Sequence, residues 1–240
     1  MLTYEFLKAK PKELLSATGL TVAEFEQLFS AFALAYQAKY QADTTVDGKP
    51  RQRKSGGGTK GKLQRLEDKL LFILVYQKTY PLQTMQGLHF NLSQSQTNHL
   101  IHRLAPVLQE ALTQLAMKPE RDGTTLAESE TAQTQPADWQ VDGSERRRQR
   151  PKDKDKQRDH YSGKKKSHTD KNLLVINPET NRVVYLSPTK PGKTHDKKLA
   201  DQEGIVYPRG TTLAKDTGFQ GYEPAGVITF QPKKSQEELS

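Results

Sequence analysis

The sequence predicts an α+β protein, with an all-α first part and a second part built on a mixed sheet. Two observations lead to this prediction. Between residues 18 and 117 the apolar residues recur at helical spacing, whereas from Trp139 onward they form short runs rich in β-branched residues. The stretch between these parts is polar and has few apolar residues. We therefore expect a helical domain over residues 1–118, a linker over 119–136 and an α/β domain over 137–240.

Composition limits what such a chain can do. It has 240 residues, with 37 basic and 28 acidic side chains, a net charge of +9 and no cysteine. The lack of cysteine excludes disulfide scaffolds, thiol catalysis and zinc sites built on cysteine. The longest apolar run, residues 70–76, is far shorter than the roughly 20 residues that cross a bilayer, and the first residues do not form a secretory signal. The basic balance favours an anionic partner, with nucleic acid first.

The first helices have a clear start signal. Thr21 and Glu24 form a capping box in front of an apolar stripe that runs to Tyr36, which predicts a helix packed in a core. Residues 41–62 then carry clustered cations and three consecutive glycines, so we expect a flexible loop there. This loop either contacts DNA phosphates or is a solvated linker, and the sequence leaves both possibilities open.

The next three predicted helices have the layout of a helix-turn-helix. A supporting helix over residues 63–78 precedes a short helix over 82–90, a turn, and a second helix that begins at the capping box of Ser93 and Gln96. An ordinary helical hairpin with a polar face is the alternative. On the DNA-binding interpretation, the second helix presents donors and acceptors outward to base edges or phosphates. These residues are Gln94, Ser95, Thr97, Asn98 and Arg103.

In the second part the apolar period changes from helical to extended. Short strands are predicted at residues 139–141, 173–176, 182–186, 211–215 and 227–230, and the second and third of them form a hairpin. The result is a mixed sheet with little room for helices.

Two aspartates in this part come at the ends of predicted strands. Asp142 and Asp216 are each followed within two residues by a glycine. Strand ends are where open α/β sheets place ligands. Two converging carboxylates at such a position can hold Mg²⁺, which prefers hard oxygen ligands. A pair of such ions suits phosphodiester displacement.

Dense cations follow the first of these aspartates, between residues 145 and 171. Beside a metal site they suit a polyphosphate substrate, whereas a disordered charged insertion is the alternative. The candidate DNA-binding cations are Arg146, Arg147, Arg148, Lys164, Lys165 and Lys166.

Five blocks of this part, in this order, resemble DDE-type insertion-sequence transposases. They read VDGSE at 141–145, QRP at 149–151, YSGKKKSHT at 161–169, PGKTHDK at 191–197 and KDTGFQGY at 215–222. The resemblance implies an RNase H-like fold and Mg²⁺-dependent, two-metal cutting and joining of double-stranded DNA at terminal repeats and target sites. It makes Asp142 and Asp216 the first and second metal-binding aspartates. It also implies a homo-oligomer on DNA, in the cytoplasm of a prokaryote and associated with the nucleoid, and no role for a membrane.

The sequence departs from this family at the third acid, a glutamate in a block of the form R-x-x-V-E-H. Glu237 and Glu238 lie in a polar context soon after the last predicted strand, and neither is assigned this role. We therefore expect a catalytic domain that is incomplete at its C-terminus, inactive alone, with a second polypeptide carrying the remaining helix. The alternative is a catalytically inactive DNA-binding remnant or regulator of transposition. His195 and Asp196 match a family block, but the sequence assigns them no role.

Overall fold

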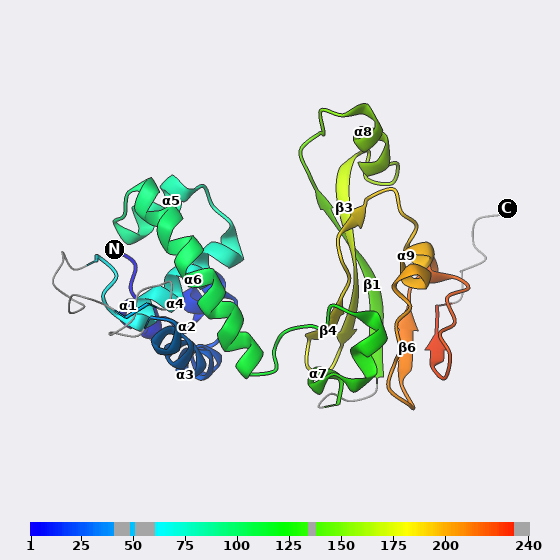
Figure 1. Ribbon diagram of the computed structural model, residues 1–240, viewed down its shortest axis with the longest axis horizontal. Helices are drawn as coiled ribbons and strands as arrows, with labels where there is room; N and C mark the ends of the chain where they lie inside the picture. Colours follow the sequence, from blue (N-terminus) through cyan, green and yellow to red (C-terminus); the bar gives the residue numbers. More distant parts are fainter. Residues whose placement is uncertain (41–48, 51–60, 134–137, 233–240) are drawn as a thin grey trace. The chain divides into compact units, whose positions relative to one another are not determined.

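The computed structural model describes residues 1–40, 49–50, 61–133 and 138–232. The chain divides into two compact units, Met1–Ala116 and Met117–Ser240. Figure 1 shows the helices of the first unit and the strands of the second. Each unit has its own apolar core. None of the described helices is both long and apolar enough to cross a membrane.

The first unit is all-α, as predicted. Its described helices are α1 (Tyr4–Lys8), α2 (Pro11–Thr18), α3 (Val22–Lys39), α4 (Leu66–Thr79), α5 (Gln83–Phe90) and α6 (Gln94–Gln114). The capping box that starts α3 is present: the Thr21 hydroxyl accepts a hydrogen bond from the Glu24 backbone N–H, and the Glu24 carboxylate accepts one from the Thr21 backbone N–H. Helix α3 packs against α6, and buried aromatic rings such as Phe72 and Phe90, 5.1 Å apart, fill the core.

Helices α5 and α6 are joined by a tight turn. Asn91 has a left-handed backbone with φ of 54°, and the N–H of Leu92 donates to the carbonyl of Gly87. The second predicted capping box is also present, with Ser93 and Gln96 bonded to each other's backbone N–H. The predicted order of helix, turn and helix is therefore correct. Most of the predicted basic loop over 41–62 lies outside the described residues.

Gly87 holds this turn closed because it has no side chain. A Cβ at this position would lie 2.6 Å from the carbonyl oxygen of Leu92. We expect Gly87→Ala to lower the free energy of unfolding by about 1–3 kcal/mol, as overpacking does, because a backbone carbonyl cannot move aside easily. Urea denaturation measures this. Gly61→Ala is the control, since nothing lies within 4 Å of its Cβ position. Equal stability of the two variants would contradict the expectation.

The second unit is built on a mixed sheet, also as predicted. Its strands are β1 (Asp138–Arg147), β2 (Tyr161–Ser162), β3 (Ser167–Asn177), β4 (Arg182–Leu186), β5 (Lys190–Pro191), β6 (Thr212–Lys215) and β7 (Ile228–Phe230). The main path runs β2-β3-β1-β6-β7, and β4 and β5 also pair with β3. The β1–β3 and β3–β4 pairs are antiparallel, whereas the β1–β6 and β6–β7 pairs are parallel.

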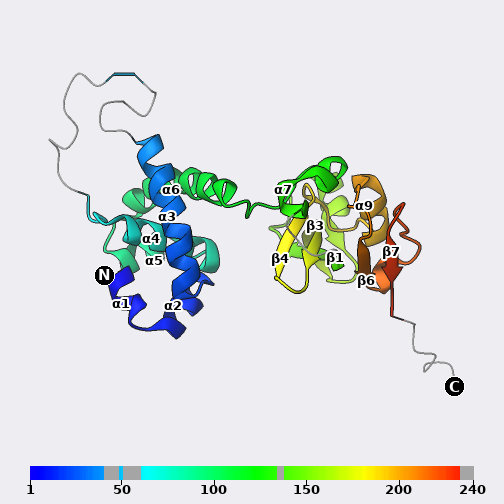
Figure 2. The same cartoon turned by 90° about the horizontal axis from the view of Figure 1, so that it is seen from below.

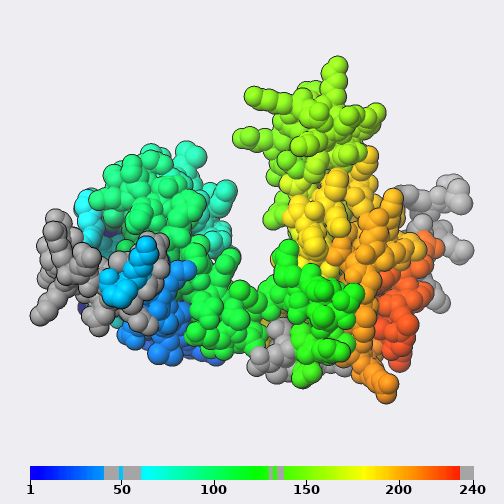
Figure 3. All heavy atoms as spheres, viewed as in Figure 1, coloured from blue at the N-terminus to red at the C-terminus, as the bar shows by residue number. Residues whose placement is uncertain are grey.

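Strands β1 and β3 form a long hairpin with α8 (Lys154–His160) at its far end (Figure 1). We call residues 145–171 the arm. None of the residues of α8 is buried, and its side chains protrude from the surface (Figure 3). The charged run is thus an ordered hairpin that carries a short helix, and the alternative of a disordered insertion is wrong.

The expectation of little room for helices is also wrong. Helix α9 (Asp196–Glu203) lies against the sheet and buries Leu199 and Ala200 (Figure 2). A short helix with only two buried apolar residues has almost no periodic signal. The short 3₁₀ helix η2 (Thr217–Phe219) follows β6 and buries Phe219 in the same core.

The predicted linker mostly belongs to the second unit. Glu120 pairs with β4: its N–H donates to Val184, and its carbonyl accepts from Leu186. The 3₁₀ helix η1 (Gly123–Glu128) buries Leu126 in the second core, and the short α7 (Glu130–Gln133) follows it. The expectation of a bare linker is therefore wrong for these residues, because isolated apolar side chains in a polar stretch can still be buried. Residues 134–136 lie outside the described residues.

Candidate functional site

The sheet brings Asp142 and Asp216 to neighbouring strands. Val141 of β1 stands opposite Lys215 of the parallel strand β6, so the two aspartates follow at the same level. Both side chains are exposed. Each carboxylate accepts a hydrogen bond from a nearby glycine N–H, at 2.7 Å from Gly143 and 2.8 Å from Gly218. One detail differs from expectation: β1 continues to Arg147, so Asp142 lies within β1, where the pairing with β6 stops.

A third carboxylate, to which the sequence assigns no role, lies beside this pair. Asp196 is the first residue of α9, and its side chain fills the space that two glycines leave open. A Cβ on Gly143 would lie 2.6 Å from Asp196 Oδ1, and one on Gly218 would lie 3.0 Å from Asp196 Oδ2. The Cβ position of Gly218 is also 3.0 Å from Asp216 Oδ1, so the carboxylates of Asp196 and Asp216 flank the same glycine. The available sequence signal was the glycine after each strand aspartate.

Lys171 of β3 holds Asp196 in this position. Its ammonium group lies 3.0 Å from Asp196 Oδ1 and donates to the carbonyl oxygen of Thr194 at 2.8 Å. The residue is only 7% exposed. Lys171 therefore belongs to the interior of the site, unlike the exposed lysines of the arm, Lys164, Lys165 and Lys166. A lone buried lysine would be costly, and the ion pair with Asp196 offsets that cost.

A cavity of about 370 Å³ opens next to Asp196. Its walls include Glu145, Lys164, Lys193 and Gly218. Burial raises the pKa of Glu145, but hydrogen bonds from Ser162 and Thr169 and the nearby Lys171 outweigh burial, so its pKa lies below the ordinary value. The cavity thus carries fixed charges of both signs.

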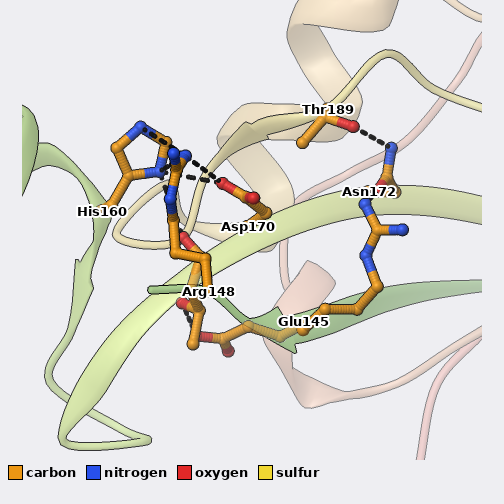
Figure 4. A network of polar contacts seen from close by, with 8 residues as sticks. Glu145, Arg148, His160, Asp170, Asn172 and Thr189 are labelled. Atoms are coloured by element: carbon orange, nitrogen blue, oxygen red, sulfur yellow. Dashed lines mark hydrogen bonds and ion pairs between the residues drawn. The ribbon is translucent and has the colours of Figure 1, made fainter. Parts of the chain in front are cut away.

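Two of the arm's candidate DNA-binding cations are engaged in polar contacts at its base (Figure 4). Arg146 donates to Asn172 at 2.8 Å, and Arg148 donates to Asp170 at 2.8 Å and contacts His160. These contacts bind the two strands and α8 together. The other candidates, Arg147 and Lys164 to Lys166, are exposed.

The predicted contact residues of α6 do not all face outward. Gln94 and Ser95 are exposed and Asn98 is half-buried. Thr97 is fully buried, and its hydroxyl donates to the carbonyl of Ser93. The expectation that Thr97 presents itself to DNA is therefore wrong, because this position lies on the core face of the helix.

Arg103 lies against the aromatic side chains at the end of α3. Its guanidinium lies over the ring of Tyr40, 4.2 Å from the centroid, and near the hydroxyl of Tyr36. Stacking on aromatic rings draws this side chain toward α3.

His195 is the exposed N-cap of α9, and its side chain makes no capping hydrogen bond. Among the described residues, no three carboxylate or imidazole side chains converge closely enough to hold a metal ion by themselves. Glu237 and Glu238, for which no role was assigned, lie outside the described residues.

Comparison with known proteins agrees with the resemblance seen in the sequence. Residues 141–240 match the sequence model of the DDE superfamily endonuclease family. The chain is 23% identical over 218 residues to a Microchaete diplosiphon protein described as "Probable transposase for insertion sequence element IS702", an alignment that covers 91% of this chain and 74% of the relative. No solved structure matches the chain. The family match begins one residue before Asp142 and includes Asp196 and Asp216, and the alignment with the relative covers both units; the second unit is similar to DDE superfamily endonucleases, and the chain is similar over both units to an insertion-sequence transposase.

Proposed function

We propose that the chain binds double-stranded DNA at element ends and target sites, as a homo-oligomer, and that Asp142 and Asp216 hold Mg²⁺ for strand cleavage and transfer. The observation that supports this most is the register of β1 and β6. Because Val141 pairs with Lys215, the two exposed carboxylates come to the same level of adjacent strands.

The chemistry of these side chains fits Mg²⁺. Both aspartates offer hard oxygen donors, and each is exposed enough for the ion to keep water or phosphate oxygens in its coordination shell. A bound metal pair would supply an activated attacking oxygen and a stabilised leaving oxygen. The N–H groups of Gly143 and Gly218 orient the two carboxylates. Asp196 offers a further carboxylate next to Asp216, and Lys171 fixes its position.

The arm is proposed to hold the DNA backbone beside these acids. Replacing Lys164, Lys165 and Lys166 together by glutamine is expected to weaken binding to any duplex. Each lost phosphate contact lowers the slope of log K against log salt by about 0.9, so the slope should fall by about 2–3. Fluorescence anisotropy over a salt series measures this. The matching triple substitution by arginine keeps the charge and should keep the slope. An unchanged slope in the glutamine variant would show that these lysines do not contact DNA.

A second candidate function is a DNA-binding regulator without catalysis. The exposed Gln94 and Ser95 at the start of α6 favour a DNA-reading role for the first unit. Such a protein would bind element ends without cutting them.

A cleavage assay on a plasmid that carries the element ends separates the two functions. Cutting or joining by the chain in Mg²⁺ or Mn²⁺, abolished by EDTA, supports the transposase. Activity that requires a second polypeptide with the remaining catalytic helix supports the same chemistry on a divided site. Specific DNA binding without metal-dependent cleavage under either condition favours the regulator.

A further inference from the structure

The first unit contains a cavity of about 700 Å³ beside the start of α6. Its walls come from α3, from the start of α4 and the segment before it, and from the first half of α6 and the turn before it. The residues that matter here are Tyr36, Lys62, Lys69, Ser95, His99 and Arg103.

The charge of this cavity is one-sided. Among the lining residues that the structure describes, Lys62, Lys69 and Arg103 are cations and none is a carboxylate. Lys69 Nζ and Arg103 Cζ lie 5.5 Å and 5.9 Å from the centroid of the same ring, that of Tyr36. Aromatic rings therefore hold two cations near each other. An anion between them would relieve the repulsion.

Two further observations indicate that an anion would be stabilised in this cavity. The Nε of Arg103 is buried and has no hydrogen-bond partner among the described residues. Burial and the nearby Arg103 lower the pKa of Lys69, although its acidic neighbours Asp68 and Glu67 act in the opposite direction. A buried donor without a partner is costly in a folded protein, and a ligand that accepts its hydrogen bond removes that cost.

We propose that this cavity seats a backbone phosphate of DNA, with Lys69 and Arg103 as its two charged donors. The inference rests on the proposed function, because it assumes that the chain binds DNA. A phosphodiester fits both the charge and the mixed lining, since its sugar can lie against apolar walls. Phosphate contacts fix orientation without reading sequence. A phosphate held here would fix α6 on the duplex and leave the exposed Gln94 and Ser95 free to contact bases.

The first test uses the full-length chain and two blunt duplexes, one with the element end and one of random sequence. Lys69→Met and Arg103→Gln should each weaken binding to both duplexes alike and lower the salt slope by about 1. Lys69→Arg should restore the slope. Lys12→Gln removes an exposed lysine of α2 outside the cavity and should leave the slope unchanged.

The second test needs no substitution. An amine-acylating reagent should modify Lys69 in the free chain, and a bound duplex should protect it more than Lys12, as peptide mass spectrometry measures. If the parent chain binds DNA, but the duplex does not protect Lys69 and Lys69→Met does not change the salt slope, the phosphate site is wrong and the proposed function stands. Parent chain that binds no DNA would overturn both. Melting temperatures identify any variant that loses affinity because it unfolds. For such a variant, protection of Lys69 in the parent chain decides whether the cavity binds a DNA phosphate.

Discussion

Replacing Asp142 or Asp216 by asparagine is expected to reduce metal-dependent strand cleavage at least about a hundredfold while the chain stays folded. Metal ions supply several kcal/mol of stabilisation to the transition state of phosphoryl displacement, and about 1.4 kcal/mol corresponds to a factor of ten in rate. Asparagine keeps the shape of the side chain but removes the charge that attracts the ion. Because both aspartates are exposed and lie side by side, loss of one charge should leave the metal-free fold as stable as before or more so.

Three measurements on each variant check this result: cleavage in Mg²⁺ or Mn²⁺, Mn²⁺ affinity by calorimetry, and melting temperature without metal. Asp201→Asn is the matched control, because it removes the same charge from an exposed position on α9. The control should bind Mn²⁺ and cut DNA like the parent, if the parent cuts alone. Unfolding of Asp142→Asn would make that residue structural, and unchanged Mn²⁺ affinity would remove it from the metal site.

Local signals in the sequence were enough for much of the fold. Both capping boxes, the turn between α5 and α6, and the hairpin of β3 and β4 depend on residues close together in the chain. Helix α9 could not be predicted in this way, because Leu199 and Ala200 are its only buried residues and their burial depends on a sheet formed by distant segments.

The site shows the same division between local and distant information. The strand aspartates were visible as strand-end acids followed by glycines. The outward position expected for Thr97 was wrong, although the helical period of the apolar residues indicates the correct face. Thr97 stands four residues before the buried Ile101 and therefore on the core face. Lys171 stands two residues before the buried Leu173, so strand alternation indicates that it points inward as well. The role of Asp196 was out of reach, since its position beside Gly143 and Gly218 arises only when α9 packs on the sheet.

Gly143→Ala is expected both to destabilise the second unit and to lower its affinity for the metal ion. The added Cβ would lie 2.6 Å from Asp196 Oδ1 and 3.1 Å from its Cγ. Lys171 pairs with the same oxygen, so the carboxylate cannot move away without breaking a buried ion pair. Overpacking of this kind costs about 1–3 kcal/mol. Denaturant unfolding and Mn²⁺ calorimetry measure the two effects.

Gly163→Ala is the control for this substitution, because nothing lies within 4 Å of its Cβ position, and its stability should stay within about 0.5 kcal/mol of the parent. The double variant Gly143→Ala/Asp196→Ala tests the cause. Removing the Asp196 carboxylate makes room for the new methyl group, so the cost of Gly143→Ala should largely disappear in the Asp196→Ala background. If Gly143→Ala costs the same in both backgrounds, the glycine is needed for another reason, and Asp196 does not occupy the space beside Asp142 and Asp216. If the cost disappears and Mn²⁺ affinity falls in Gly143→Ala, the seat of Asp196 between the two glycines sets the geometry of the acids that hold the metal.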